Sequence, residues 1–260
     1  VDNYPGLPGM GGYDLGMKLR EHADALGAVF AEDEVVRVEN DGEIKRVVCE
    51  QETYEAKALI IATGARWRLI GIPGETEFRN KGVAYCTHCD GPLYKGKNVA
   101  VIGGGNSGIE AAIDLAGLAK HVTVLEFLPD LKADDALLKK LKTLSNVTVI
   151  TNAQTTGLYG DGKVEKLAYT DRISGDKAEI DISGCFIQVG LVPNTEWLKD
   201  SAVELSDRGE ILTAGDGSTN VKRVFAAGDA TDTLFKQIVI AAGSGATAAL
   251  GTYNYLMVNE

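Results

Sequence analysis

The segment NVAVIGGGNSGIEAAIDLAG, residues 98–117, constrains the fold more than any other part of the chain. Gly103, Gly105 and Gly108 form the pattern G-x-G-x-x-G between an apolar run and a helix-forming stretch. The next apolar run, VTVLEF, ends in an acidic residue, Glu126. A strand, a glycine turn, a helix and a second strand with an acid about 20 residues on are typical of a dinucleotide-binding unit.

Each residue type in this pattern has a physical reason. Glycine permits the tight turn at 103, lets the backbone approach a pyrophosphate at 105, and lets helix and strand pack closely at 108. The phosphates would lie at a helix N-terminus, where free N–H groups and the helix dipole favour negative charge. The alternative is a glycine turn that binds no ligand. The residues expected at the nucleotide are Gly103, Gly104, Gly105, Asn106, Ser107, Gly108 and Glu126.

Glu126 also predicts which nucleotide binds. Its carboxylate can accept a hydrogen bond from a ribose 2′-hydroxyl, whereas it would repel a 2′-phosphate. The following stretch, FLPDLK, has no basic residue before Lys132. We therefore expect NADH rather than NADPH.

Charge and cysteine content exclude several classes of protein. The chain has 26 Lys and Arg against 37 Asp and Glu, a net charge of −11, so we expect neither nucleic acid nor a membrane surface as partner. Four cysteines in 260 residues are not a secreted disulfide framework, and we expect a reducing, cytoplasmic location. The uncharged run 238–258 is long enough to span a membrane, but glycine, serine and threonine dilute it, so we expect a buried helix.

The rest of the chain has readable periodicity. Residues 97–151 alternate between apolar runs and helical patterns, which predicts a parallel sheet covered by helices. Residues 163–190 are interpreted as antiparallel strands around a turn at Ser174-Gly175. Residues 13–27 predict a helix, and residues 28–41 and 44–64 predict strands with a turn at Asp41-Gly42.

Cys86 and Cys89 stand in a C-x-x-C spacing within AYCTHCDGPLYKG. A zinc site needs about four ligands, and this pair has only His88 nearby. A purely structural disulfide closing so short a loop would constrain the unfolded chain little. A redox pair is the best interpretation. Cys49 and Cys185 are isolated in strand patterns and are expected to be inert.

Two neighbours of the pair have open roles. Reducing a disulfide requires a proton, which Asp90 could supply if its pKa were raised; alternatively it is a turn residue before Gly91. His88 could tune the pKa of a thiolate or simply face solvent. Because nicotinamide delivers a hydride and a disulfide does not ordinarily take one directly, we expect a flavin between them.

With these motifs placed, the chain resembles the thioredoxin reductase-like flavoproteins along essentially its whole length. Within that family it is most similar to the flavoprotein subunits of bacterial alkyl hydroperoxide reductases. The resemblance rests on VDNYPG, IIATGA, YCTHCDGPLYKGK, VAVIGGGNSGIEAAIDLAG, VTVLEF, NAQTT, LVPNTEWL, TNVKRVFAAGDAT and KQIVIAAGSGA. Thioredoxin reductases usually have His-Arg-Arg where this chain has LEF, so the resemblance favours the NADH-using, peroxide-reducing branch.

The resemblance implies a role for each matching residue. Cys89 would lie near the flavin, Cys86 would exchange with a downstream disulfide, and Asp90 would be the acid. The residues implied at FAD are Asn3, Thr63, Gly64, Ala227, Gly228, Asp229, Lys236, Gln237 and Ile238. The family's first FAD-binding strand and glycine loop precede the residue matching Asn3, so we expect this chain to lack that cradle. A homodimer is also implied.

We therefore expect an α/β protein with two Rossmann-like three-layer domains. The NADH domain, 70–198, would be inserted into a discontinuous, N-terminally truncated FAD domain, 1–69 and 199–260, through hinges near 66–74 and 194–200. Electrons would pass from NADH through FAD and the cysteine pair to an N-terminal redox module absent from this sequence, and then to a peroxiredoxin subunit. The rivals are an NADH-linked thioredoxin reductase and an inactive nucleotide-binding fragment.

Overall fold

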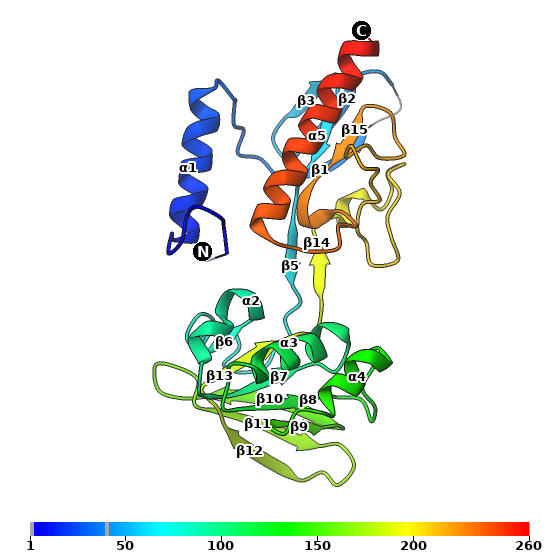
Figure 1. Ribbon diagram of the computed structural model, residues 1–260. Coiled ribbons are helices and arrows are strands. Elements are labelled where there is room, and N and C mark those ends of the chain that lie inside the picture. The colour runs from blue at the N-terminus through cyan, green and yellow to red at the C-terminus, as the bar shows by residue number, and fades with distance from the viewer. Residues whose placement is uncertain (1–2, 40–41, 260) are drawn as a thin grey trace. The chain divides into compact units, whose positions relative to one another are not determined.

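The computed structural model describes residues 3–39 and 42–259, which form two compact units (Figure 1). Unit 2 is the continuous segment Trp67–Gly190, and unit 1 combines the segments on either side of it. Asp41 of the predicted turn lies outside the described residues. Each unit has its own hydrophobic core, so each is described by itself.

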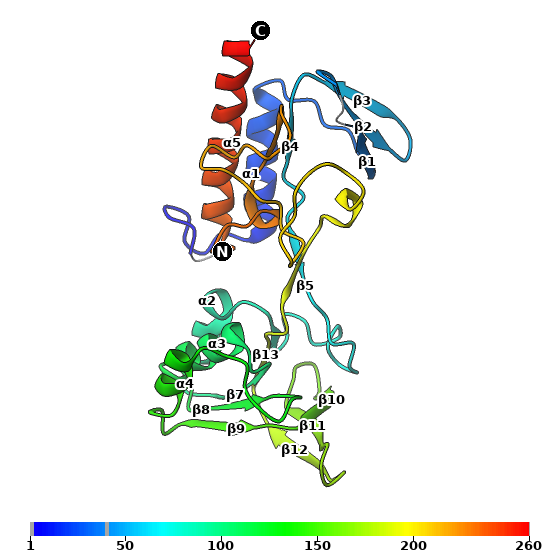
Figure 2. The same ribbon diagram turned by 90° about the vertical axis from the view of Figure 1, so that its right-hand side faces the viewer.

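Unit 2 is built on a five-stranded parallel sheet with the strand order β6-β13-β7-β8-β9. The helices α3 and α4 cover one face, and the antiparallel sheet β10-β11-β12 covers the other (Figures 1 and 2). The predicted α/β fold with a helix-covered parallel sheet is confirmed. The bounds are β6 Val83–Ala84, α2 Thr87–Asp90, η1 Gly91–Tyr94, β7 Asn98–Ile102, α3 Asn106–Ala116, β8 His121–Leu125, α4 Asp135–Leu141, β9 Val147–Ile150, β10 Ala153–Tyr159, β11 Lys166–Asp171, β12 Lys177–Asp181 and β13 Gly184–Ile187.

The central strand β7 shows why the glycine turn stands where it does. Val101 packs in the same core cluster as Ile109 of α3, while Ile102 packs with Leu167 of β11 on the opposite face. Because both faces are covered, the strand is a continuous apolar run rather than an alternating one. The strand therefore delivers Gly103 directly to the carboxyl edge of the sheet, where α3 begins.

One strand differs from the sequence interpretation. The sequence pattern makes Gly184–Ile187 part of an antiparallel set, but β13 is parallel to both β6 and β7. All four of its residues are buried, as expected of a strand inside a parallel sheet covered on both faces. The antiparallel hairpin around Ser174-Gly175 consists of β11 and β12 alone, with β10 completing that sheet.

Unit 1 contains an antiparallel sheet, β1-β2-β3, and a parallel pair, β4 with β15. Phe225 of β15 packs with Ala248 and Tyr255 of the last helix, α5. The bounds are α1 Gly12–Ala25, β1 Val35–Glu39, β2 Lys45–Cys49, β3 Thr53–Ala56, β4 Leu59–Ile61, η2 Glu196–Leu198, β15 Val224–Ala226, η3 Gly228–Ala230 and α5 Ile238–Asn259.

Helix α5 corrects one expectation. The sequence predicts a buried helix, but Ala248 is its buried residue, and Leu250, Tyr253 and Met257 are exposed. The helix packs on β15 through one side only, which leaves its other apolar residues uncovered. Within residues 3–39 and 42–259, none of the helices has the length and apolar character that crossing a membrane requires.

The chain passes between the units through β5 (Ala65–Trp67) and β14 (Leu191–Pro193), which pair with each other. Unit 2 ends at Gly190, whereas the sequence predicts this boundary near residue 198. The difference has a packing reason, because Leu198 is fully buried with Ile61 and Ile211 in the core of unit 1.

Candidate functional site

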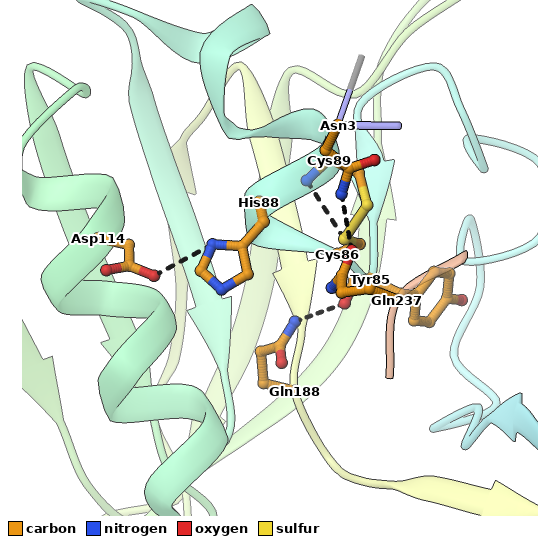
Figure 3. Close-up of a disulfide and its surroundings, with 8 residues drawn as sticks. All are labelled: Asn3, Tyr85, Cys86, His88, Cys89, Asp114, Gln188 and Gln237. Atoms are coloured by element: carbon orange, nitrogen blue, oxygen red, sulfur yellow. Dashed lines mark hydrogen bonds and ion pairs between the residues drawn. A yellow bond between two sulfur atoms is a disulfide. The ribbon is translucent and has the colours of Figure 1, made fainter. Parts of the chain in front are cut away.

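Cys86 and Cys89 form a disulfide, with a Cα–Cα distance of 5.3 Å (Figure 3). Cys86 is the N-cap of α2, and its sulfur accepts a hydrogen bond from the Cys89 N–H at 3.2 Å. An N–H aimed at sulfur favours the thiolate over the thiol, so this contact favours Cys86 as the attacking sulfur. No group of three or more His, Cys, Asp or Glu side chains in the described part of the chain could hold a metal ion.

Asp90 ends helix α2, directly after Cys89. Burial raises the pKa of its carboxyl above the ordinary aspartate value, because desolvation disfavours the charged form. A carboxyl with a raised pKa retains a proton at higher pH and can donate it.

The imidazole of His88 faces α3, with its Nδ1 3.6 Å from a carboxylate oxygen of Asp114 (Figure 3). Both side chains are exposed, so solvent screens this pair and its contribution to stability is small.

Sequence reasoning missed the residues that support the strand end before Cys86. The carbonyl of Tyr85 accepts a hydrogen bond from Gln188 Nε2 at 2.8 Å, and its hydroxyl donates to Glu75 at 3.0 Å. The carboxylate of Glu75, 2% exposed, also accepts from the N–H groups of Ile70 and Gly71. Burial, followed by this hydrogen bond, raises the pKa of Tyr85. No periodic pattern in the sequence marks Glu75 as buried.

The glycine loop has the geometry that its sequence predicts. Gly103 has φ +120°, and a Cβ there would lie 2.4 Å from the carbonyl oxygen of Gln188. A Cβ on Gly108 would lie 2.0 Å from the carbonyl oxygen of Gly103, so only glycine lets α3 pack this closely against the end of β7. Gly105, the N-cap of α3, has no atom within 4 Å of a Cβ position. The loop thus has no room for side chains at Gly103 and Gly108, whereas there is free space at Gly105, beside the N-terminus of α3.

Asn106 and Glu126 hold this loop in place. Asn106 Oδ1 accepts from the Asp134 N–H at 2.8 Å, which ties α3 to the start of α4. The two carboxylate oxygens of Glu126 accept hydrogen bonds from the N–H groups of Gly104 and Leu128. The Glu126 side chain is 9% exposed. The two backbone hydrogen bonds fix the orientation of its carboxylate.

A cleft of about 340 Å³ opens beside the loop, within the size range of ligand pockets. Its apolar wall includes Ile70, Ile72 and Val189, and its polar wall includes Glu126 and Thr155. The open N-terminus of α3, the carboxylate and the cleft fit a dinucleotide, because they offer a place for a pyrophosphate and an acceptor for a ribose.

In unit 1, several residues implied at FAD contact one another or the same neighbour. Asn3 Nδ2 donates to Gln237 Oε1 at 2.7 Å, although the two are far apart in sequence. Thr63 exchanges two hydrogen bonds with Asn194, and Gly64 accepts the Asn194 N–H at 3.0 Å.

The segment around Asp229 is the part of unit 1 that best fits a cofactor. Gly228 has φ +74°, and its N–H donates to Ser244 Oγ at 3.0 Å, while the Ala227 N–H donates to the carbonyl of Ile61. Asp229 Oδ1 is buried without a hydrogen-bond partner, and burial raises the pKa of its carboxyl. A buried polar atom of this kind fits a ligand hydroxyl, which would satisfy it.

Lys236 and Ile238 lie at the entry to α5. The Lys236 ammonium donates to the carbonyl of Thr231 and lies 3.0 Å from a carboxylate oxygen of Glu210. The sequence does not predict this pairing. Ile238 begins α5 and is 46% exposed, so its side chain can contact a ligand.

A glycine turn shaped for a dinucleotide and a C-x-x-C disulfide in the same unit define the class of nucleotide-dependent disulfide oxidoreductases. The chain belongs to the pyridine nucleotide-disulphide oxidoreductase family, whose model matches residues 11–245. This family of flavoproteins uses FAD and NAD(P)H, in agreement with the predicted pair of cofactors.

Relatives with assigned names are similar over the whole chain. It is 50% identical over 260 residues to an NADH dehydrogenase of Bacillus subtilis (strain 168), covering 100% of this chain and 51% of that protein. It is 48% identical over 263 residues to an alkyl hydroperoxide reductase subunit of Escherichia coli (strain K12), covering 99% and 50%. The chain thus spans about half the length of these relatives.

Among solved structures, the thioredoxin reductase from Streptococcus pyogenes MGAS5005 is similar with a TM-score of 0.93 and 34% identity, covering 99% of this chain and 84% of that one. The resemblance inferred from the motifs is therefore confirmed.

Proposed function

We propose that this chain forms part of an NADH-dependent flavoprotein disulfide reductase that passes electrons to a peroxiredoxin system reducing alkyl hydroperoxides. The observation that carries the proposal is the Cys86–Cys89 disulfide, held in the same unit as the glycine turn and Glu126. The similarity to the Escherichia coli alkyl hydroperoxide reductase subunit supports this choice of acceptor.

In this proposal the N–H groups of the α3 N-terminus hold the pyrophosphate of NADH, and Glu126 accepts a hydrogen bond from the ribose. Asp229, whose Oδ1 has no hydrogen-bond partner among the described residues, would hold FAD together with Gly228, with Asn3, Thr63, Gly64 and the start of α5 beside it. When bound, FAD supplies two-electron transfer between a hydride donor and a disulfide.

Two electrons break the bond between the sulfurs of Cys86 and Cys89, and one proton is taken up, leaving one thiol and one thiolate. The Cys89 N–H favours the thiolate on Cys86 Sγ, so the proton goes to Cys89 Sγ, with Asp90 as its donor. The Cys86 thiolate then attacks the acceptor disulfide and forms a mixed disulfide. Cys89 loses its proton to the acceptor and attacks Cys86 Sγ, which re-forms the pair and releases the acceptor as one thiol and one thiolate; a proton from water completes the acceptor dithiol.

The test uses the full-length protein with its peroxiredoxin and an alkyl hydroperoxide. We expect NADH oxidation that depends on both, and its loss in Cys86→Ser and Cys89→Ser. Cys49→Ser is the matched control, because Cys49 is a free thiol of unit 1 and takes no part in the pair. Unchanged peroxide reduction in either variant of the pair would contradict the proposal.

A second acceptor has support from a specific observation. The similarity to the Streptococcus pyogenes thioredoxin reductase favours thioredoxin in place of the peroxiredoxin system. The full-length protein is therefore also assayed with NADH and oxidised thioredoxin. Faster NADH oxidation with thioredoxin than with the peroxiredoxin would identify thioredoxin as the acceptor, and the reverse would support the peroxiredoxin system.

A further inference from the structure

The peptide group that leads into Cys86 is held by a side chain from another strand. Strand β6 pairs with β13 at Val83 and Ala84, and Tyr85 follows the last of these pairs. The Tyr85 carbonyl accepts a hydrogen bond at 2.8 Å from the side chain of Gln188, which follows the end of β13 (Figure 3). The glutamine side chain thus supplies the partner that a backbone group needs where the ladder ends.

Gln188 is itself held firmly in place. Its N–H donates to the Ile102 carbonyl at 2.8 Å, which fixes its backbone to the end of β7. The Gly103 backbone packs closely against its carbonyl, because a Cβ at position 103 would lie 2.4 Å from that oxygen. A side chain whose backbone is fixed in this way can place its donor with little freedom of movement.

The side chain of Tyr85 is anchored as well as its carbonyl. Tyr85 is 6% exposed, its hydroxyl donates to the buried Glu75 carboxylate at 3.0 Å, and its ring stacks on Trp67 with the centroids 6.0 Å apart. The guanidinium of Arg79 lies 5.6 Å from the centroid of the same ring. Because both parts of the residue are held, the peptide group after Tyr85 cannot rotate without breaking a hydrogen bond.

The orientation of this peptide group determines where Cys86 lies. A peptide bond is planar, so the Tyr85 carbonyl and the Cys86 Cα lie in one plane. On the other side, the Cys86 carbonyl accepts a hydrogen bond from the Asp90 N–H at 3.0 Å. Both peptide groups that flank Cys86 are therefore fixed, and its sulfur lies 3.2 Å from the Cys89 nitrogen. That N–H favours the thiolate on Cys86.

We propose that Gln188 is a positioning residue of the redox pair, which acts through the Tyr85 carbonyl to keep Cys86 Sγ at the Cys89 N–H and so makes Cys86 the more reactive sulfur. The inference rests on the proposed function, in which Cys86 attacks the acceptor disulfide. Sequence spacing gives no sign of this role, because Tyr85 and Gln188 lie 103 positions apart.

The test compares the two sulfurs directly. The full-length protein is reduced with dithiothreitol, freed of the reductant without air, and treated briefly with iodoacetamide at neutral pH. Mass spectrometry then measures the alkylation of Cys86 and of Cys89. The ratio of the two reports where the thiolate lies, because the thiolate is the nucleophile. A general loss of stability would expose both sulfurs and raise both rates together, which leaves the ratio unchanged.

Two variants test the hydrogen bonds in turn. In the parent we expect Cys86 to be alkylated faster than Cys89. Gln188→Met keeps the length of the side chain but removes its donor, and should lower the ratio about 3- to 10-fold. Tyr85→Phe keeps the ring but removes the hydroxyl that anchors it, and should lower the ratio at least about twofold.

Each variant has a matched control in the same unit. Gln154→Met makes the same change at an exposed glutamine of β10, and Tyr169→Phe makes it at a partly buried tyrosine of β11. Neither should change the ratio. All four variants leave the neighbouring titratable side chains His88, Asp90 and Asp114 intact. Thermal unfolding verifies that each variant is folded, and if Gln188→Met is not, Tyr85→Phe decides alone.

A ratio in Gln188→Met and Tyr85→Phe equal to that of the parent would overturn the role of Gln188. Faster alkylation of Cys89 in the parent, or an equal fall in the controls, would overturn it as well. Reduction by dithiothreitol requires neither NADH nor a peroxiredoxin. The positioning role can therefore fail while NADH-dependent peroxide reduction is observed, and the reverse, so the two failures are distinguishable.

Discussion

The glycine loop allows a sharp separation of folding from binding, through alanine at two positions of one motif. At Gly108 a new Cβ would lie 2.0 Å from the Gly103 carbonyl oxygen and 2.7 Å from its carbon, both backbone atoms. Contacts this short force helix α3 away from the sheet, at a cost typical of overpacking, about 1–3 kcal/mol. For a domain of this size that lowers Tm by roughly 2–12 °C.

Gly105→Ala is the matched partner of Gly108→Ala. The Cβ site at Gly105 is empty to 4 Å and its φ of −83° suits alanine, so we expect no loss of stability. The new methyl group instead occupies the approach of a pyrophosphate, and NADH binding should weaken at least about tenfold. Thermal unfolding and NADH titration of both variants test the argument. Equal destabilisation by Gly105→Ala and Gly108→Ala, or normal NADH binding by Gly105→Ala, would contradict these roles of the two glycines.

Three further changes have definite expected outcomes. Glu126→Arg should lower the ratio of NADH to NADPH affinity, and titration with each nucleotide measures it; a ratio that stays constant would count against the role of Glu126. Because the raised pKa of Asp90 keeps its acid protonated to higher pH, reduction of the Cys86–Cys89 disulfide by NADH should slow as pH rises through that pKa. Asp90→Asn should remove this pH dependence, and a rate profile that keeps its shape would exclude Asp90 as the donor. Glu75→Gln should lower the free energy of unfolding by about 1–3 kcal/mol in denaturant titrations, since an amide N–H₂ would face N–H donors. The exposed Glu77→Gln is its control, and equal effects would contradict this account.

Local sequence was sufficient for the glycine turn. The roles of Gly103, Gly105 and Gly108 follow from backbone sterics within one strand–helix connection, so their spacing and the acid at 126 predict the geometry directly. The cysteine pair is equally local, because Cys86 and Cys89 are three positions apart and the disulfide closes within one helical turn.

Other features depend on contacts that sequence spacing does not contain. The direction of β13 is decided by which strands it lies between, and its apolar run fits a parallel or an antiparallel partner. Arg172 reaches Phe127 because the β11–β12 hairpin folds back beside β8, and Glu75 reaches Tyr85 across a loop. An arginine in a hairpin turn and a glutamate after a proline-glycine pair otherwise look like ordinary surface residues.

The insertion of unit 2 into unit 1 has a consequence for how the chain folds. Strand β4 pairs with β15, so Leu59 meets Val224 across the whole of unit 2. Unit 2 is continuous and can form first, and in it the Arg68 N–H donates to the Gly190 carbonyl at 3.0 Å. Once that contact exists, the loop left to close is roughly fourfold shorter, which lowers the entropic cost of pairing β4 with β15 by about 1.2 kcal/mol. We therefore expect unit 2 to fold first during synthesis and to bring the two segments of unit 1 close together before they pair.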